Sequence, residues 1–204
     1  MARRSPNVTW HDPATSRDEH WSATGTRGAT VWLTGLPSSG KSSIAAALER
    51  SLVVDGHAAY FLDGDNLRHG ISGDLAFSPA DRTENIRRVA HLARLMADAG
   101  MVAIASLVSP TRHDRALARE LHKAAGLKFL EVYVNTPLEV CEARDPKGLY
   151  ARARAGKLAD FTGVSAPYEA PQQPDVLIHG ADEDAAIAAA RIREALEQAW
   201  AWSS

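Results

Sequence analysis

The chain has 204 residues, of which 45% are hydrophobic and 24% are charged, as in an ordinary soluble globular protein. This length fits one α/β domain with a terminal arm, because a domain usually takes about 100–200 residues. The formal net charge of -2 argues against a protein that binds nucleic acid or another polyanion over its whole surface.

Cysteine usage and the absence of targeting signals indicate a cytoplasmic protein. Cys141 is the only cysteine, so no internal disulfide can form, and this suits a reducing compartment. The basic residues near the start are not followed by an apolar stretch, so we expect no secretory signal. No run of about 18 apolar residues occurs, so we expect no membrane span. The eight histidines show no zinc-binding spacing.

Residues 1–27 are polar and irregular apart from two tryptophans, Trp10 and Trp21. Exposed tryptophans are unusual in a disordered tail, so we expect this segment to be an arm that packs on the domain. A loosely attached leader is the alternative. At the other end of the chain, Trp200 and Trp202 are expected to pack on the domain or on a partner.

The clearest motif follows an apolar strand over residues 30–34. Gly35, four further residues and then Gly40, Lys41 and Ser42 match the phosphate-binding loop G-x-x-x-x-G-K-[ST], and a helix begins at once. The two glycines let backbone N–H groups approach a phosphate, and the start of the helix adds its positive end. Lys41 would reach the β- and γ-phosphates of a nucleotide, and the Ser42 hydroxyl would hold Mg²⁺. A glycine turn with an unrelated lysine is the alternative.

A second strand over residues 58–62 completes a right-handed βαβ unit, so we predict a parallel sheet. Residues 63–68 read Asp-Gly-Asp-Asn-Leu-Arg and follow the carboxyl end of that strand, where open parallel sheets bind their ligands. Asp63, Asp65 and Arg68 could organise a Mg²⁺-bound nucleotide and a second substrate. A turn with solvated charges is the alternative.

Ser78 and Pro79 mark the start of a helix that runs to about residue 99. Arg82 and Asn85 share one face of it because they are three residues apart. A solvated basic face and an anion-binding face are both open readings. Three further strands are expected, over residues 101–107, 129–134 and 176–178. Three further helices are expected, over 113–125, over 183–200, and a short one that has Thr136 as its N-cap.

Residues 144–157 are strongly basic and bounded by glycines, which predicts a mobile lid of about residues 144–162 that closes over phosphates. Together the elements predict, over residues 28–204, a P-loop NTPase-type three-layer α/β sandwich with a central parallel sheet of about five strands. The lid and the charges at the nucleotide side favour phosphoryl transfer to a small molecule. A GTPase switch is disfavoured, because no N-K-x-D guanine motif occurs.

Several blocks of the sequence, in order, resemble the adenylyl-sulfate (APS) kinase family of the P-loop kinase superfamily. The phosphate loop alone is shared by many NTPases. The blocks D-G-D-N-x-R, D-R-x-E-N-I-R-R and R-D-P-K-G-L-Y are together far more specific, and the resemblance covers nearly the whole chain. The blocks lie at residues 7–11, 35–41, 63–68, 77–78, 81–88, 109–110, 141–150, 161–163 and 167–171.

The resemblance implies that ATP phosphorylates the ribose 3′-hydroxyl of adenosine 5′-phosphosulfate (APS) to give PAPS, with Mg²⁺ as the cofactor. The implied ATP-binding residues are Gly35, Ser38, Ser39, Gly40, Lys41, Ser42, Ser43 and Arg144. The implied APS-binding residues are Asp65, Asn66, Arg68, Phe77, Arg82, Asn85, Val108, Ser109, Lys147, Asp160 and Phe161. The implied catalytic residues are Lys41, Asp63, Asp65, Ser109 and Lys147, with Ser42 and Asp63 at the metal.

By the same resemblance, Arg68, Arg82 and Asn85 would hold the phosphosulfate group. Phe77 and Phe161 would stack the APS adenine from two sides, in the offset manner of aromatic pairs.

Three further roles come from the resemblance. Asp63 and Asp65 would sit by the metal and the attacking hydroxyl. Lys147 and the lid arginines would stabilise charge on the transferred phosphoryl group, because catalysis of this kind is mainly positioning and electrostatics. Ser109 matches a serine that is phosphorylated in some family members, and we expect it to act here by positioning.

Four residues depart from the family pattern. Pro37 should stiffen the phosphate loop, Ala76 replaces an expected glycine, Thr111 replaces a larger residue, and Ser165 stands where an acid is expected. None of the four removes a chemical group named above. We therefore expect the activity to be kept and only the affinity for the acceptor to be affected.

Two other functions stay open from the sequence: a P-loop kinase of another small-molecule acceptor, and a non-catalytic nucleotide-sensing domain. By family analogy we expect a homodimer, with ATP sulfurylase as a partner enzyme. No nucleic-acid or membrane partner is expected.

Overall fold

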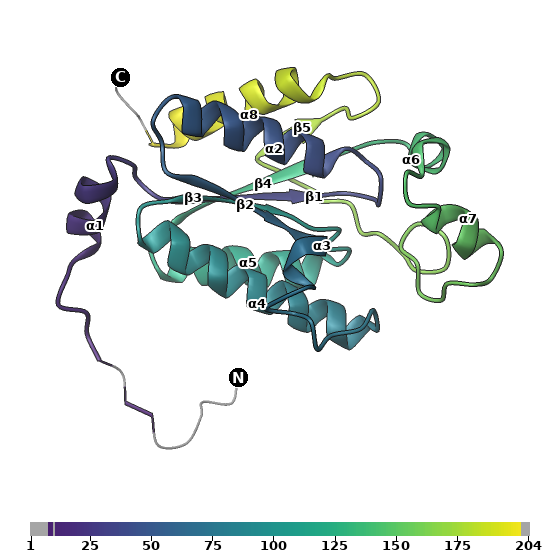
Figure 1. The fold of residues 1–204 in the computed structure, drawn as a ribbon, viewed down its shortest axis with the longest axis horizontal. Coiled ribbons are helices and arrows are strands. Elements are labelled where there is room, and N and C mark those ends of the chain that lie inside the picture. The colour runs from purple at the N-terminus through teal and green to yellow at the C-terminus, as the bar shows by residue number, and fades with distance from the viewer. Residues whose placement is uncertain (1–7, 10, 201–204) are drawn as a thin grey trace.

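The computed structural model describes residues 8, 9 and 11–200. The arm residues Asn7 and Trp10 and the C-terminal Trp202 lie outside the described residues. A five-stranded parallel sheet of order β2-β3-β1-β4-β5 forms the centre of the molecule, as the sequence predicts (Figure 1). The strands are β1 (Ala29–Thr34), β2 (Ala59–Asp63), β3 (Val102–Ser106), β4 (Lys128–Val134) and β5 (Val176–Ile178).

The central strand β1 is buried along its whole length and pairs with β3 on one side and β4 on the other. Val31, for example, lies opposite Ile104 and Leu130. A parallel strand covered on both faces needs such a continuous apolar run. β1 therefore delivers the phosphate loop to the middle of the carboxyl edge of the sheet.

Two helices cover each face of the sheet (Figure 1). α2 (Lys41–Val54) and α8 (Ala185–Trp200) pack together on one face, and α4 (Pro79–Asp98) and α5 (Arg112–Ala124) on the other. Among the described residues, no helix combines the length and the apolar composition needed to cross a membrane.

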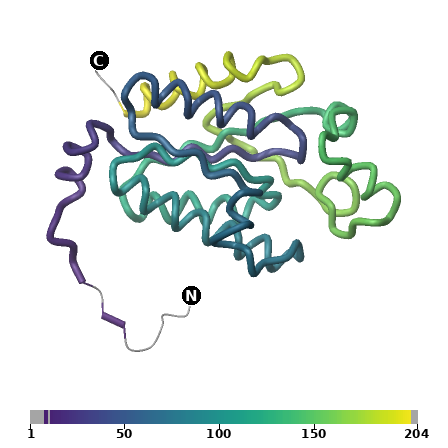
Figure 2. Tube along the Cα trace, viewed as in Figure 1, coloured from purple at the N-terminus to yellow at the C-terminus, as the bar shows by residue number. Residues whose placement is uncertain are grey.

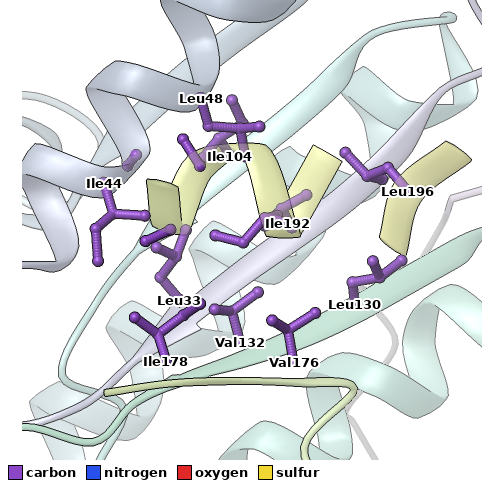
Figure 3. Packing of buried hydrophobic residues seen from close by; sticks show 14 of the residues in the cluster. Leu33, Ile44, Leu48, Ile104, Leu130, Val132, Val176, Ile178, Ile192 and Leu196 are labelled. Carbon is purple, nitrogen blue, oxygen red and sulfur yellow. The ribbon is translucent and has the colours of Figure 1, made fainter. Parts of the chain in front are cut away.

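The apolar side chains form one core on each face of the sheet. Ile44 and Leu48 of α2 meet Ile192 and Leu196 of α8 over the strands (Figure 3). On the other face, Trp32 of β1 packs with α4 and α5 in a separate cluster. These two cores hold the sheet rigid and fix the edge from which the loops of the site emerge.

The smaller helices lie at opposite ends of the molecule (Figure 2). At the carboxyl edge of the sheet are α6 (Leu138–Arg144) and α7 (Leu149–Arg154), and at the other end is α1 (Arg17–Thr24). Trp21 of α1 donates a hydrogen bond to Ala97 O at 3.1 Å and meets Trp200 edge-on, with ring centroids 5.5 Å apart. Residues 17–24 of the arm are therefore in contact with the ends of α4 and α8.

Two local expectations are corrected by the structure. α6 begins at Leu138 with Pro137 as its N-cap, whereas the hydroxyl of Thr136 donates to Ser39 O at 2.8 Å. Thr136 therefore ties α6 to the phosphate loop and does not cap the helix. Residues that we expected to be loop form α3 (Gly64–Leu67), because the Asp63 carboxylate accepts hydrogen bonds from the N–H groups of Asp65 and Asn66.

Candidate active site

A cleft of about 1220 Å³ opens at the carboxyl edge of the sheet. Its walls are the phosphate loop, the ends of β2 and β3, the first turns of α4 and the segment that carries α6 and α7. This volume exceeds that of a usual single-ligand pocket, which is about 300–1,000 Å³. The cleft can therefore hold two small molecules side by side.

The phosphate loop takes a conformation that depends on its glycines. Gly35 has φ 155°, and a Cβ atom there would lie 2.6 Å from Val134 O. Gly40, just before α2, has φ 102°, in the left-handed region that other residues rarely adopt. Ser38 also has a positive φ, of 60°. The loop thus reverses direction just before α2, and residues 38–43 line the cleft at the start of that helix.

Lys41 is the buried cation of the loop, with 7% of its surface exposed. Its Nζ donates to Leu36 O at 2.6 Å and to Ser39 Oγ at 3.2 Å. Burial lowers the pKa of Lys41 to about 8, although Cys141, Asp65 and Asp63 act in the opposite direction. A bound phosphate group would favour the charged form of this lysine.

Ser42 and Asp63 bring two oxygen groups together at the start of α2 and the end of β2. Ser42 Oγ donates to Asp63 Oδ2 at 3.0 Å, and Asp63 Oδ1 accepts from the N–H groups of Asp65 and Asn66. Hydroxyl and carboxylate oxygens are ligands that suit Mg²⁺. Within the described part of the chain, no three His, Cys, Asp or Glu side chains gather as a metal site. A cation at this place would therefore take further ligands from water or phosphate.

Arg68 and Phe77 form a stacked pair on the side of the cleft between α3 and the start of α4. The Arg68 guanidinium carbon lies 4.3 Å from the centroid of the Phe77 ring, and Nη1 donates to Ala76 O at 2.8 Å. Ala76, the departure from the family glycine, contributes this carbonyl. Phe77 remains 58% exposed, so the ring presents open surface beside Arg68.

Arg82 joins the start of α4 to the end of the lid segment. Its Nε donates to Phe77 O at 2.9 Å, its Nη1 to Thr162 Oγ1 at 2.8 Å and its Nη2 to Asp160 O at 2.6 Å. Asp160 has a positive φ of 53°. In this structure Arg82 thus joins the backbone of Phe77 to that of Asp160, and each terminal nitrogen has one more N–H to offer.

Asn85 lies one turn after Arg82, on the same face of α4, and also lines the cleft. The residue is 5% exposed, and its Oδ1 has no hydrogen-bond partner among the described residues. A buried, unpaired carbonyl oxygen is costly unless a ligand or a water satisfies it. Asn85 therefore has an acceptor available for a bound molecule.

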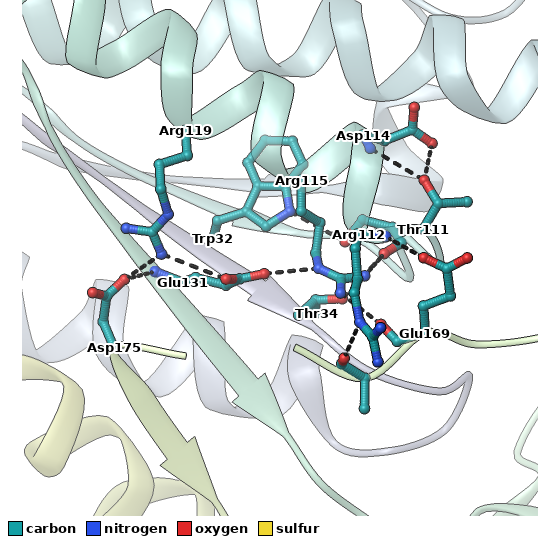
Figure 4. A network of polar contacts seen from close by, with 12 residues as sticks. Trp32, Thr34, Thr111, Arg112, Asp114, Arg115, Arg119, Glu131, Glu169 and Asp175 are labelled. Carbon is teal, nitrogen blue, oxygen red and sulfur yellow. Dashed lines mark hydrogen bonds and ion pairs between the residues drawn. The ribbon is translucent and has the colours of Figure 1, made fainter. Parts of the chain in front are cut away.

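Val108 and Ser109 follow β3 and face the same cleft. Ser109 has φ 38°, and its Oγ accepts a hydrogen bond from Trp32 Nε1 at 3.1 Å (Figure 4). Thr34 Oγ1 donates to Val108 O at 2.8 Å. Two residues of β1 thus hold the loop that follows β3.

The expected lid has a small apolar core of its own. Phe161 is buried, with its ring edge-on to Tyr150 at a centroid distance of 5.0 Å, and Cys141 belongs to the same cluster. Ser165, which replaces an expected acid, accepts a hydrogen bond from Phe161 N at 2.9 Å. Tyr150 donates its hydroxyl to Pro37 O at 3.0 Å. The lid segment is therefore linked directly to the phosphate loop.

Two basic residues of the lid segment reach across the cleft. Lys147 forms an ion pair with Asp65, and both side chains are exposed. Arg144 donates to Gly180 O at 2.8 Å and to Ser39 O at 3.4 Å. The start of the lid segment thus contacts both Asp65 of α3 and the phosphate loop.

The structure gathers nearly all of the sequence-predicted site residues around one cleft. Of these predicted residues, only Gly35 and Asp160 lie outside its lining. Sequence reasoning missed Ser106, which lies opposite Asp63 in the sheet register, with its hydroxyl 3.5 Å from that of Ser42. The one feature of the sequence that could have identified Ser106 is that it is a single polar residue at the end of an apolar strand.

Comparisons with known proteins identify the family of this chain. The family model described as adenylylsulphate kinase matches residues 27–179. An adenylyl-sulfate kinase of Saccharomyces cerevisiae is 55% identical over 83% of this chain and 84% of its own length. The bifunctional enzyme NodQ of a Rhizobium strain is 48% identical over 96% of this chain and 31% of its own length.

Among solved structures, the Mycobacterium tuberculosis APS kinase CysC in complex with AMPPNP and APS resembles this chain closely. Its TM-score is 0.82 and its sequence identity 51%, over 84% of this chain and 99% of that one.

Proposed function

The chain belongs to the adenylylsulphate kinase family, and we propose how its cleft transfers the γ-phosphoryl group of ATP to the ribose 3′-hydroxyl of APS. The protein is an ATP-dependent kinase that converts APS to PAPS. The observation that carries this conclusion is the similarity to a kinase solved with both an ATP analogue and APS. A sensor without activity or a kinase of another acceptor has no comparable support.

The phosphate loop supplies the ATP site. Backbone N–H groups of Ser38 to Ser43 surround the phosphates, and Lys41 leaves its contact with Leu36 O to bind the β- and γ-phosphates. Arg144 already bonds to Ser39 O and Gly180 O and lies at the other end of the nucleotide. These positions support an ATP molecule that runs from Arg144 to the middle of the cleft.

Ser42 and Asp63 are the residues of this chain that would hold Mg²⁺, and their bonded oxygens fit that ion. When bound, Mg²⁺ neutralises charge on the phosphates and orients the γ-phosphoryl group for in-line attack. Asp63 is itself held by two backbone N–H groups of α3, so its carboxylate is fixed before any ligand arrives.

APS occupies the side of the cleft that Arg68, Phe77, Arg82 and Asn85 line. The open surface of Phe77 stacks on the adenine, because aromatic side chains bind bases face to face. The free N–H groups of Arg82 and of Arg68 bind the phosphosulfate group. Phe161 is buried against Tyr150 in the small apolar core of the lid segment. The adenine therefore contacts the edge of that core at Phe161.

Asp65 and Lys147 act at the reacting atoms. Asp65 has a more open carboxylate than Asp63, so it orients the 3′-hydroxyl and accepts its proton as the oxygen attacks the γ-phosphorus. Lys147, which is paired with Asp65 in this structure, then stabilises negative charge on the phosphoryl oxygens. Val108, Ser109, Asn66 and Asp160 shape the acceptor side, and residues 144–162 close over both substrates as a lid.

The wider setting follows from the same family. We propose a homodimer that works in the cytoplasm and associates with ATP sulfurylase. The match of 96% of this chain to 31% of a bifunctional enzyme supports a physical link between this kind of domain and another activity.

The test is a measurement of ADP release from ATP and Mg²⁺, with and without APS, combined with analysis of the nucleotide product. We expect ADP only when APS is present, together with a product that carries a 3′-phosphate. ADP release that does not depend on APS, or a product without the 3′-phosphate, would overturn the function.

A further inference from the structure

Arg115 of α5 is a charged side chain in the interior, with a relative exposure of 2%. Its three guanidinium nitrogens donate to three separate segments of the chain (Figure 4). Nε donates to Glu131 Oε1 on β4 at 2.7 Å, Nη1 to Ser109 O at 2.6 Å and Nη2 to Glu169 O at 2.6 Å. One buried guanidinium group thus joins β4, the loop after β3 and the return segment, which leads from the end of the lid at about residue 162 to β5.

Stability alone does not explain this arginine. Removing a guanidinium and its carboxylate partner from water costs free energy that their attraction often fails to offset, and apolar side chains of similar volume can do as well. What a buried arginine adds is a planar group with donors in fixed directions. At Arg115 two of those directions end on backbone carbonyls, so the group fixes where the two segments lie.

The first of these segments needs such support. Ser109 has φ 38°, a conformation that non-glycine residues adopt only when their surroundings impose it. Trp32 Nε1 fixes its hydroxyl, Arg115 fixes its carbonyl, and Thr34 fixes the preceding carbonyl of Val108. Ser109 and Val108 line the cleft on the acceptor side.

The second segment is fastened to the first by further hydrogen bonds. Glu169 N donates to Pro110 O at 2.8 Å, and Glu169 Oε2 accepts from Arg112 N at 2.8 Å. Tyr168, the residue before, places its hydroxyl 2.9 Å from Thr34 Oγ1. The backbone of the return segment is therefore joined to the loop that carries Ser109, both by these hydrogen bonds and by Arg115.

We propose that Arg115 is a positioning residue for the acceptor: it sets Ser109 and Val108 in place for APS and couples them to the segment that returns from the lid. This role rests on the proposed function, which gives APS to that side of the cleft. Arg115 does not itself touch the substrate. Its effect reaches APS through the carbonyls of Ser109 and Glu169, and none of its hydrogen bonds goes to the phosphate loop.

Three variants test the role: Arg115→Met, Arg115→Lys and, as a matched control, Arg119→Met. Arg119 lies one helical turn later and bonds to the opposite oxygen of Glu131 at 3.4 Å and to Asp175 at 2.6 Å (Figure 4). The control thus disturbs the same ion-pair network at the end away from Ser109. For each variant we would measure thermal unfolding, kcat, and the KM values for APS and for ATP separately.

We expect Arg115→Met to raise the KM for APS about tenfold or more, with the KM for ATP changed less than about twofold. Arg115→Lys keeps the positive charge but loses the planar guanidinium with its donors in fixed directions. This variant should therefore fold well and still show the raised KM for APS. Arg119→Met should leave both KM values unchanged. If Arg115→Met does not fold, Arg115→Lys carries the comparison.

The role of Arg115 is overturned if the folded Lys variant binds APS as the wild type does, if both KM values rise together, or if Arg119→Met gives the same shift. The proposed function is tested separately, by APS-dependent turnover of the wild type in the same assay. A wild type without that turnover overturns the function, and this role with it.

Discussion

The guanidinium carbon of Arg68 lies 4.3 Å from the centroid of the Phe77 ring, and the backbone carbonyl of Phe77 accepts a hydrogen bond from Arg82. Two arginines thus hold an aromatic residue whose surface is still 58% exposed. A cation over one ring face stabilises such an arrangement by about 0.5–1 kcal/mol at an exposed site. The ring is fixed before the acceptor arrives, so little conformational entropy is lost when a base stacks on it.

Phe77→Ala should therefore weaken acceptor binding with little change in stability. Stacking of a base on an aromatic side chain contributes about 1–3 kcal/mol, so we expect the KM for APS to rise about tenfold. The KM for ATP should stay within about twofold of the wild type. Leu95→Ala, which removes a similarly exposed apolar side chain from α4, is the control. Equal changes in the two KM values would argue against stacking on Phe77.

The pKa of Lys41 predicts a link between ATP binding and protons. Burial lowers this pKa to about 8 in the free protein, and nearby phosphates favour the charged form and raise it again. ATP affinity should thus fall as the pH rises through about 8, and binding above that pH should take up a proton. Below about pH 8 the lysine is already protonated in the free protein, so ATP binding should cause no proton uptake by this group.

Calorimetric titration of ATP in buffers of different ionisation enthalpy would measure that proton uptake. Lys41→Met, which is close in shape and has no charge, should lose the uptake and about a hundredfold or more of the turnover. Circular dichroism should show that this variant is folded. The same proton uptake in Lys41→Met would mean that another group titrates.

The lid segment should be sensitive to protease in the free enzyme and protected by substrates. Its basic residues Arg152, Arg154 and Lys157 are exposed, so trypsin should cut there. Bound ADP and APS should slow this cleavage because closure buries the segment. The pair between Lys147 and Asp65 is exposed and worth little on its own, so high salt should speed the cleavage only slightly. Cleavage at one rate with and without the ligands would contradict closure.

Trp21→Ala tests the proposal that the arm packs on the domain. The change removes the hydrogen bond to Ala97 O and the edge contact with Trp200, so the melting temperature should fall. A loss of about 1–2 kcal/mol corresponds to roughly 2–8 °C for a domain of this size. Both KM values should stay unchanged, since α1 lies at the opposite end of the molecule from α7, which lines the cleft (Figure 1). His20→Ala, an exposed neighbour, should leave the melting temperature unchanged.

Local patterns were enough to predict the sheet and the place of the site. A strand with a continuous apolar run can be predicted from its own residues, without knowledge of its partners in the sheet. The spacing from Gly35 to Ser42 likewise defines the phosphate loop by itself. The rule that ligands bind at the carboxyl ends of parallel strands correctly put Asp63 and Ser109 on one edge. These predictions depend on residues that are close in sequence or on a general property of the fold.

Contacts between distant side chains were not predictable in this way. Thr136 looked like a helix cap, yet its hydroxyl bonds to the phosphate loop, 97 residues away. For Arg82 the sequence leaves a solvated face and an anion-binding face open, and neither predicts its hydrogen bond to Thr162, 80 residues away. Arg115 carried no signal, because one charged residue in an amphipathic helix looks like any solvated one. Such partners depend on the final packing, which periodicity does not encode.

The order of strands in the sheet also bears on how the protein is made. β1 leaves the ribosome before both of its neighbours, because β3 begins at Val102 and β4 at Lys128. Pairing across such separations requires closure of long loops, which slows folding. A nascent chain that stops before β4 would carry the phosphate-loop sequence beside β2 and β3 only, without the strand whose end lies against Gly35. Retention of nucleotide by the growing chain would thus mark the moment at which β4 has joined the sheet.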